Sequence, residues 1–365
     1  MAKKNIIIKI GSSNLVKDGK VDIDKMNYLS NIIKKYKGKD YEFIIVSSGA
    51  VAIGKERMKT TDLVLKTKQK QAMSAIGQPL LMKKYDEAFS KNDIITAQVL
   101  LTRDDLENRK RYIKARDTLL ELLEFNVVPI INENDTVSTK EIKIGDNDNL
   151  SARVASAVEA DILIILSDID GLYDKNPSTN PNANLISEVK ELTDEIWKNA
   201  GGSGSSVGTG GMVTKLEAAE ICMKVGTAMY IINGKDIGNL EKVLNDEQVG
   251  TKFIPNEKIV NRKKMWIGYS LRAQGRIYID DGAEEALKNG KSLLPSGITR
   301  IKGSFEVGDM VSIYNKKRKE IARGIVNYNS DEIFKIERRR SEEIEELLGY
   351  KSREEVIHRD NLITI

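Results

Sequence analysis

Short runs of apolar residues alternate along most of the chain with segments in which apolar residues recur every three or four positions. The runs are strand-sized and predict buried strands at residues 5–10, 43–46, 94–101, 127–131, 161–166 and 229–232, the last of which we expect to close the domain. Helical spacing predicts helices at 26–36, 69–89, 109–125, 150–159 and in a segment that ends at 225. Gly77 and Pro79 are expected to break the second of these helices. The alternation predicts an α/β fold, a mainly parallel sheet sandwiched by helices.

The pattern changes after residue 256, and this change predicts a second domain. Residues 257–274 contain Asn-Arg-Lys-Lys at 261–264 and are interpreted as a linker. Beyond them, short apolar runs at 275–279, 292–294, 297–301, 310–314 and 320–326 are typical of a small β-barrel. Residues 337–349 favour a charged helix. We therefore expect domains at 1–256 and 275–365. A Gly-Ser run at 201–206 predicts a flexible loop in the first of these domains.

Polar residues follow the predicted strands at the points where those strands end. Lys9, Ser48, the stretch 132–135 and Ser167-Asp168 all lie there, and a second polar stretch at 145–151 opens a helix. One interpretation is that these are ordinary turn and capping residues, since Asn and Asp satisfy free N–H groups at helix starts. In open α/β sheets, however, ligands bind outside the carboxyl ends of the strands. The agreement of four strands favours one shared site.

The segment 208–215, Gly-Thr-Gly-Gly-Met-Val-Thr-Lys, is glycine-rich and opens a helix. Closely approaching backbone N–H groups and the helix dipole together favour an anion. Its glycine spacing does not match a P-loop, and a flexible helix start is the alternative. We expect Lys215 in the first helical turn, where a cation is unfavourable unless a polyanion neutralises it. This lysine therefore favours a phosphate-binding loop.

Composition narrows the chemistry. The chain has 365 residues, of which 40% are hydrophobic and 31% charged, with one cysteine, one histidine and a formal net charge of +4. A single cysteine excludes an internal disulfide framework, and one histidine leaves no support for histidine-based catalysis or metal sites. The longest apolar runs are too short to span a membrane. The N-terminus enters a strand without a signal region, so we expect a cytoplasmic protein.

Two lysines, a carboxylate and an anion-binding loop suit phosphoryl transfer. Lys9 and Lys215 would supply positive charge and Asp148 a carboxylate, and such reactions depend on positioning and charge neutralisation more than on covalent help. An acceptor that is itself a carboxylate or phosphate is already ionised at neutral pH, so it needs no general base. The absence of a candidate histidine base is consistent with such an acceptor.

These motifs resemble those of the glutamate 5-kinases, which belong to the amino acid kinase family. The resemblance rests on Lys-Ile-Gly-Ser-Ser at 9–13, Val-Ser-Ser-Gly-Ala at 46–50, Ile-Asn-Glu-Asn-Asp at 131–135, Gly-Asp-Asn-Asp-Asn-Leu-Ser at 145–151 and the segment 208–215. The loop 168–173 resembles one that is shared among amino acid kinases. Segments 292–298 and 303–311 resemble a PUA domain. The motifs run in order over nearly the whole chain, so the resemblance implies this family's fold with an appended PUA-like domain.

The resemblance implies a reaction and a role for each candidate residue. ATP would phosphorylate the γ-carboxylate of L-glutamate to give L-glutamyl 5-phosphate, the first step of proline biosynthesis. Lys9 and Lys215 would neutralise the transferring phosphoryl group, and Asp148 would hold both lysines. Glutamate would be bound by Ser48, Gly49, Asp135 and Asn147, and ATP by Lys9, Ser167, Asp168, Thr209, Gly210, Gly211, Met212, Val213, Thr214 and Lys215.

The resemblance also implies partners. Mg²⁺ would be held mostly by phosphates and water, with no protein metal cluster. Proline is an expected feedback inhibitor, and a homo-oligomer, dimer or tetramer, is expected.

Two other interpretations remain. One is another amino acid kinase with a different carboxylate, carbamate or phosphate acceptor. An acceptor without an α-amino group would give Asp135 nothing cationic to bind. The other is RNA binding through the PUA-like domain. Residues 271–365 hold 18 Lys and Arg against 17 Asp and Glu, which is not the strongly basic balance of a nucleic-acid-binding domain.

Overall fold

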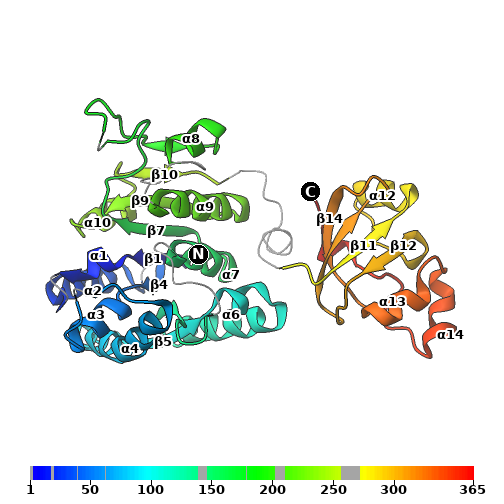
Figure 1. Cartoon of the computed structure of the whole chain (residues 1–365), viewed down its shortest axis with the longest axis horizontal. Coiled ribbons are helices and arrows are strands. Elements are labelled where there is room, and N and C mark those ends of the chain that lie inside the picture. The colour runs from blue at the N-terminus through cyan, green and yellow to red at the C-terminus, as the bar shows by residue number, and fades with distance from the viewer. Residues whose placement is uncertain are drawn as a thin grey trace. The chain divides into compact units, whose positions relative to one another are not determined.

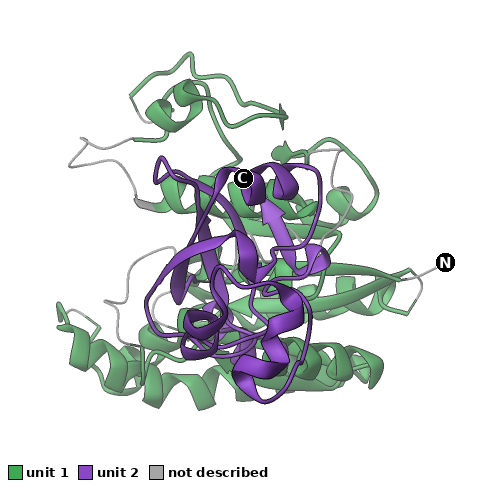
Figure 2. Cartoon of the chain, turned by 90° about the vertical axis from the view of Figure 1, so that its right-hand side faces the viewer, with its two compact units in different colours: residues 1–104, 114–258 green, residues 105–113, 259–365 purple. Residues whose placement is uncertain are grey.

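The chain forms two compact units in the computed structural model (Figure 2), which describes residues 3–17, 20–38, 40–61, 63–138, 146–177, 179–201, 210–255 and 272–365. Unit 1 comprises Met1–Asp104 and Lys114–Lys258, and unit 2 comprises Asp105–Ile113 and Ile259–Ile365. Most of the expected linker, residues 257–271, lies outside the described residues, as do Gly145, most of the Gly-Ser run and Thr209.

Unit 1 contains an eight-stranded sheet with the order β5-β6-β4-β1-β7-β9-β10-β8 (Figure 1). The pairs from β5 to β9 are all parallel, and β10 runs antiparallel to β9. The strands are β1 (Lys4–Ile10), β4 (Tyr41–Ser47), β5 (Thr96–Leu101), β6 (Val128–Glu133), β7 (Ile162–Ser167), β8 (Glu188–Val189), β9 (Ala228–Asn233) and β10 (Thr251–Phe253). A hairpin of β2 (Val16–Lys17) and β3 (Lys20–Val21) follows β1.

Helices cover both faces of this sheet. The helices between residues 12 and 244 are α1 (Ser12–Leu15), α2 (Ile23–Tyr36), α3 (Ala50–Arg57), α4 (Thr67–Phe89), α5 (Arg103–Glu107), α6 (Arg109–Glu124), α7 (Asp146–Ala157), α8 (Asp194–Asn199), α9 (Gly210–Val225) and α10 (Asn239–Leu244), with a 3₁₀ turn at Ser90–Asn92. None of the helices in the described part of the chain is both long and apolar enough to cross a lipid bilayer.

The alternation of residues along β1 assigns its side chains to the two faces. Ile6, Ile8 and Ile10 are fully buried and pack in one core cluster with residues of α2 and α4. Successive strand residues point to opposite faces, so Ile7 and Lys9 lie on the other face. There α7 packs on β1 and β7, and α9 packs on α7 and β9. Lys9 therefore projects toward the two helices that carry the predicted anion-binding residues.

Unit 2 contains a five-stranded sheet with the order β12-β11-β13-β14-β15. The strands are β11 (Gly275–Ile279), β12 (Ile298–Lys302), β13 (Met310–Tyr314), β14 (Glu320–Ile325) and β15 (Leu362–Thr364). The helices are α12 (Asp281–Lys288), α13 (Ser330–Ile336) and α14 (Ile344–Leu348), with 3₁₀ turns at Pro295–Gly297, Ser341–Glu343 and Arg359–Asn361. Ile277, Val311 and Ile313 of the sheet pack in a core with Leu287 and Ile333 of the helices.

The predicted break in the helix at 69–89 is wrong. Helix α4 runs without interruption through Gly77 and Pro79. Gly77 instead lies at a close crossing with α3, where a Cβ atom would come within 1.8 Å of the Ala50 carbonyl oxygen. Leu81 and Tyr85 are fully buried along the same helix. Burial of this face stabilises the helix against the unfavourable proline and glycine.

Three other predicted elements need correction. The strand expected at 292–294 is a single bridge between Leu293 and Ile357. The helix expected at 337–349 begins only at Ser341, as a 3₁₀ turn that continues into α14, because Arg338 takes a left-handed φ of 62° that a helix cannot contain. The strand at 229–232 is not the last of its sheet, since β10 follows it and pairs with it. Strands as short as β8 and β10 leave no periodic pattern.

Candidate active site

The carboxyl ends of four neighbouring strands form the edge of the sheet where the polar residues gather. The pairing of β1 places Lys9 between Val46 of β4 and Ile165 of β7. Because the strands are parallel, the segments that follow β1, β4, β6 and β7 all leave the sheet at this edge. The predicted convergence of Lys9, Ser48, the 132–135 stretch and Ser167-Asp168 is thus a consequence of strand order.

Asp148 lies between two buried lysines at this edge. Its Oδ1 is 2.5 Å from Lys9 Nζ, and its Oδ2 is 3.2 Å from Lys215 Nζ. The carboxylate is fully buried, and the side chains of Lys9 and Lys215 are 7% and 10% exposed. Thr214 Oγ1 also donates to Asp148 Oδ2 at 3.0 Å. Asp148 comes from the first turn of α7, Lys9 comes from β1, and Lys215 and Thr214 come from α9.

Lys215 does not lie in the first helical turn, as the sequence suggested, because α9 already begins at Gly210. It is in the second turn. Helical side chains tilt toward the helix N-terminus, and Lys215 Nζ donates to the Gly211 carbonyl at 3.0 Å. The ammonium group therefore still reaches the helix start, although its backbone position is one turn further on.

Charges in this cluster shift the protonation equilibria of its members. Burial lowers the pKa of Lys9 below its ordinary value, and Lys215 adds to this effect, against the opposing attraction of Asp148. For Asp148, burial acts to raise the pKa, but the two lysines outweigh it and the pKa lies below its ordinary value. Two cations and one anion leave an excess of one positive charge. A buried excess of this sign favours binding of an anion.

Beside this cluster, Asn147 connects the ends of β4 and β6. Its amide nitrogen donates to Ser47 O and Ser48 Oγ, both at 2.8 Å, and to Asn132 Oδ1 at 3.0 Å. Asn132 in turn donates to Gln78 Oε1 on α4 at 2.8 Å. The network holds the hydroxyl and amide groups at these two strand ends in fixed positions, as recognition of a polar ligand requires.

Two further predicted residues lie at the same edge. Asp135 follows β6 and is 9% exposed. Ser74 of α4 donates to its Oδ2 at 2.6 Å. Gly49 follows β4 with a φ of 106°, a backbone conformation that glycine adopts without strain, and it caps α3.

Ser74 and Gln78 were not predicted. They lie four residues apart, on one face of α4, and each contacts a predicted site residue. The sequence carried no clear signal for them, because the same helix has other small and amide side chains, such as Ala72, Ala75 and Gln71.

The predicted nucleotide-binding residues lie at the end of β7 and the start of α9. Ser167 is the last residue of β7, and its hydroxyl donates to Asp168 Oδ1 at 3.2 Å. Gly211, Met212, Val213 and Thr214 follow Gly210 in the first turns of α9 and are half-buried. Thr214 connects this group of residues to the lysine cluster, because its hydroxyl donates to Asp148. Thr209 lies outside the described residues.

The arrangement suits transfer of a phosphoryl group. Two ammonium groups held by one carboxylate, next to backbone N–H groups at a helix start, provide fixed positive charge for a polyphosphate. The network around Asn147 and Asp135 offers hydrogen-bond donors and acceptors for a second, polar substrate. No deprotonation step is required if that substrate is already an anion.

Comparisons with known proteins agree with this chemistry. The sequence profile described as the amino acid kinase family matches residues 4–233, and that of the PUA domain matches residues 275–348. The chain belongs to the amino acid kinase family. The resemblance inferred from the motifs is thereby confirmed, as is the fold class.

The relatives that match over nearly their whole length are named Glutamate 5-kinase. The chain is 47% identical to the one from Thermoanaerobacter sp. (strain X514), over 99% of this chain and 97% of that protein. It is 48% identical to the one from Geobacter sulfurreducens, over 99% and 98%. Among solved structures, UMP kinase from Ureaplasma parvum aligns with a TM-score of 0.50 and 18% identity, covering 70% of this chain and 100% of that one, a similarity in fold alone.

Proposed function

We propose that the chain transfers the γ-phosphoryl group of ATP to the γ-carboxylate of L-glutamate, forming L-glutamyl 5-phosphate for proline biosynthesis. The observation that carries this proposal is the buried cluster of Asp148 with Lys9 and Lys215, next to a separate polar network around Asn147. One part suits a phosphate donor and the other a polar acceptor. The names of the full-length relatives supply the identity of the acceptor.

In this reaction Lys9 and Lys215 neutralise negative charge on the transferring phosphoryl group. Asp148 is a positioning residue, because it contacts both ammonium groups and fixes the distance between them. Its own charge leaves one excess positive charge for the phosphoryl oxygens. Fixed charges of this kind lower the barrier because they need no reorganisation during the reaction.

Glutamate binds to Ser48, Gly49, Asn147 and Asp135. Asp135 is buried and bonded to Ser74, and its carboxylate attracts the α-ammonium group of the substrate. Ser48 and Asn147 are linked to each other at 2.8 Å and offer their polar atoms to the substrate carboxylates. Proline carries the same pair of ammonium and carboxylate groups on one carbon, and this supports its expected role as an inhibitor competing at these residues.

ATP binds along Ser167, Asp168 and the segment 209–215. The hydroxyl and carboxylate oxygens at the end of β7 suit the water shell of Mg²⁺, a hard ion that prefers oxygen ligands. Mg²⁺ supplies further neutralisation of the phosphates when bound. Lys9, Thr214 and Lys215 would contact the phosphate groups.

We assign the functions of the chain to the predicted domains. Residues 1–256 carry the ATP and glutamate sites, residues 257–274 connect the domains, and residues 275–365 form the PUA-like domain. The strands of the two sheets support these limits, since β10 ends at Phe253 and β11 begins at Gly275. On the resemblance alone, we also propose a homo-oligomer that acts in the cytoplasm; light scattering of the full chain measures the former.

The test is ATP consumption by the purified chain with Mg²⁺, with hydroxylamine present to trap an acyl phosphate. Glutamate is compared with aspartate, N-acetylglutamate and carbamate. A hydroxamate formed with glutamate alone is the expected result. Turnover with N-acetylglutamate or carbamate and none with glutamate would refute the assignment of the acceptor.

A further inference from the structure

A cluster of cations occupies one face of the sheet in unit 2. The antiparallel pairing of β11 with β12 places Arg276 opposite Lys302, and Tyr278 opposite Arg300. Ile277, between Arg276 and Tyr278, is fully buried in the core. Because side chains alternate along a strand, the two flanking residues point away from that core. This face therefore carries three cations within two adjacent strands.

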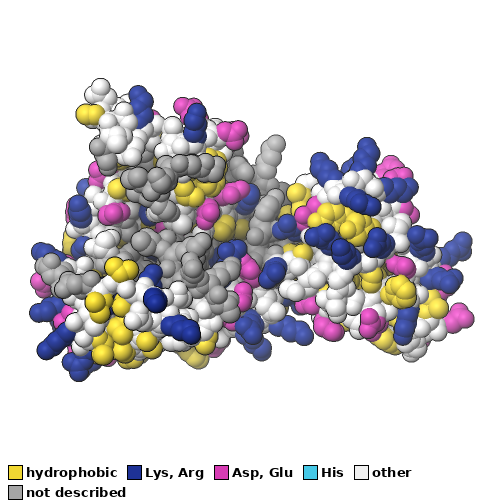
Figure 3. Space-filling model, in the orientation of Figure 1, with side chains coloured by type: hydrophobic (Ala, Val, Ile, Leu, Met, Phe, Trp, Pro, Cys, Tyr) yellow, Lys and Arg dark blue, Asp and Glu magenta, His cyan; other side chains and the backbone are white. Residues whose placement is uncertain are grey.

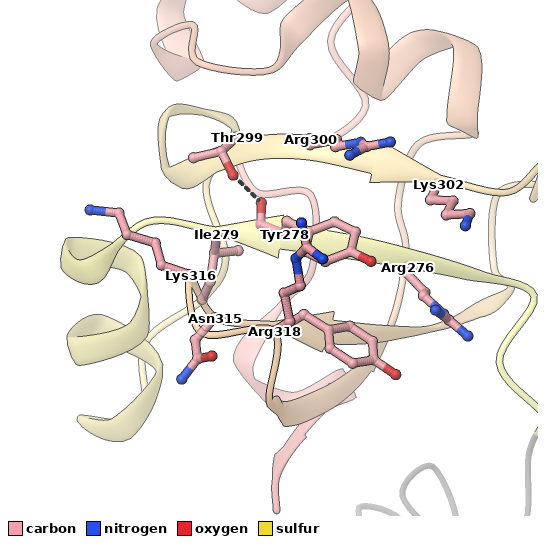
Figure 4. A pocket seen from close by; sticks show the side chains of 10 residues that line it. Arg276, Tyr278, Ile279, Thr299, Arg300, Lys302, Asn315, Lys316 and Arg318 are labelled. Atoms are coloured by element: carbon pink, nitrogen blue, oxygen red, sulfur yellow. Dashed lines mark hydrogen bonds between the residues drawn. The ribbon is translucent and has the colours of Figure 1, made fainter.

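These residues line an open concavity of about 530 Å³ (Figure 4). Lys316 and Arg318, from the turn between β13 and β14, close its other side. Among the described residues that line it, five of ten are Lys or Arg and none is Asp or Glu. The space-filling view shows Lys and Arg side chains gathered around apolar ones over β11 and β12 (Figure 3). A volume of this size suits a small ligand, since ligand pockets span about 300–1,000 Å³.

Most of this charge is not neutralised by the protein. Lys316 forms an ion pair with Asp281 at 2.6 Å, and Arg276 lies close enough to Glu320 to help lower the pKa of that carboxyl group. In the described ranges, Arg300 and Lys302 have no ion pair. Like charges directly opposite each other on neighbouring strands are unfavourable. Charged residues on the edge strand β12 protect that edge from pairing with another strand. Arg276 lies on β11, which is not an edge strand, so edge protection does not explain this charge.

Two aromatic rings lie among the cations. Parallel pairing of β11 with β13 places Tyr278 beside Tyr314, and the two ring centroids are 5.5 Å apart with the planes inclined by 32°. The Arg276 guanidinium lies 5.6 Å from the centre of the Tyr314 ring. Both rings are half-buried. Partly exposed tyrosine rings beside guanidinium groups suit a ligand that combines a flat ring with several negative charges.

The distribution of charge favours a small ligand over a long polyanion. Residues 271–365 have almost equal numbers of basic and acidic residues, 18 against 17, so the positive charge is local. A nucleic acid strand is bound along an extended basic surface. We propose that this concavity binds a free nucleoside polyphosphate, at a site separate from the catalytic nucleotide site.

The test counts nucleotide sites on the full chain by equilibrium dialysis with labelled ATP, in the absence of glutamate. Wild-type protein is expected to bind two ATP molecules per chain. The double variant Arg276→Ala/Lys302→Ala is expected to lose one, because removal of each cation weakens the site about tenfold. It should keep full kinase activity at saturating ATP. Lys317→Ala removes an exposed cation from the same turn without altering the lining, and it should keep both sites.

Further probes separate the parts of the proposal. Tyr278→Leu retains apolar packing, and it is expected to weaken the second site about tenfold through lost stacking. Inorganic tripolyphosphate should compete only weakly for it. The proposal is overturned if the wild-type protein binds only one ATP per chain and the double variant still binds it. It is also overturned by tripolyphosphate that competes as well as ATP, or by a single-stranded RNA oligonucleotide that binds this face more than tenfold tighter.

Discussion

Replacing Asp148 by asparagine tests the central feature of the site with almost no change in shape. The substitution removes one negative charge and leaves Lys9 and Lys215 buried beside a neutral amide, at the positions where their ammonium groups are now 2.5 and 3.2 Å from carboxylate oxygens. Loss of one partner of a buried ion pair costs about 3–5 kcal/mol of stability. The lysine that loses its partner can release its proton, which limits the cost, and the pKa of Lys9 is already lowered by burial.

We therefore take the lower end of that range, about 3 kcal/mol. This corresponds to a fall in Tm of about 6–12 °C for a domain of this size. If the same interaction positions the lysines in the transition state, kcat falls by about 150-fold. The Kd for ATP should not rise, because the phosphates neutralise the two lysines and the repelling carboxylate is gone. A loss of kcat with unchanged or tighter ATP binding is the signature of a positioning residue.

Calorimetry with and without ATP measures the Tm and the Kd for ATP, and the hydroxamate assay measures kcat. The matched control is Asp93→Asn, since Asp93 is 94% exposed and lies 3.9 Å from Lys34. Such a surface pair contributes about 0–1 kcal/mol, so the control should behave as wild type. Near-normal turnover of Asp148→Asn, or a Tm within 2 °C of the control, would refute the reasoning.

Other predictions follow from the same geometry. Lys9→Ala should lower kcat by about a hundredfold to a thousandfold, the range for loss of one fixed transition-state donor; turnover near normal would remove Lys9 from the site. Asp135→Ala should raise the KM for glutamate by about 10- to 100-fold through loss of a charged contact, and an equal rise in the KM for ATP would contradict the assignment. Ser74→Ala should raise the same KM about fivefold, since Ser74 orients Asp135, whereas an unchanged KM would show that this bond has no such role. Because the pKa of Lys9 is lowered on folding, the unfolded chain binds more protons between that pKa and about 10.4, so the stability contribution of Lys9 rises with pH in this window. Lys9→Met should abolish that rise in chemical denaturation measured across alkaline pH, and a rise of the same size in the variant would rule out Lys9 as its source.

The sequence predicted which residues share one edge of the sheet where that placement follows from strand order. Lys9, Asp148 and Lys215 are separated by more than 200 residues of chain, but each stands at the end of a strand or the start of a helix. In a parallel sheet those positions share one edge. The prediction was less successful where backbone geometry decides. Lys215 proved to be one turn further into its helix, because the glycines at 210 and 211 already belong to α9.

Helix α4 accounts for most of the features that the pattern of hydrophobic and polar residues did not predict. In sequence, Gly77 and Pro79 are unfavourable for a helix, and only the crossing with α3 shows why glycine is needed. A Cβ atom on Gly54 would lie 2.0 Å from the Met73 carbonyl oxygen, and one on Gly77 would lie 1.8 Å from that of Ala50. The two backbones can approach this closely only without side chains at those points.

That close approach sets the position of α4 against the end of the sheet. The residues around Gly77 are the ones that face the polar network: Ser74 bonds to Asp135, and Gln78 bonds to Asn132. A wider separation of α3 and α4 would carry both side chains away from partners that they now reach at 2.6 and 2.8 Å. Hydrogen bonds weaken steeply beyond such distances. Gly77, which appeared to interrupt the helix, is thus, together with Gly54 of α3, a condition for the contact of α4 with the acceptor side of the site.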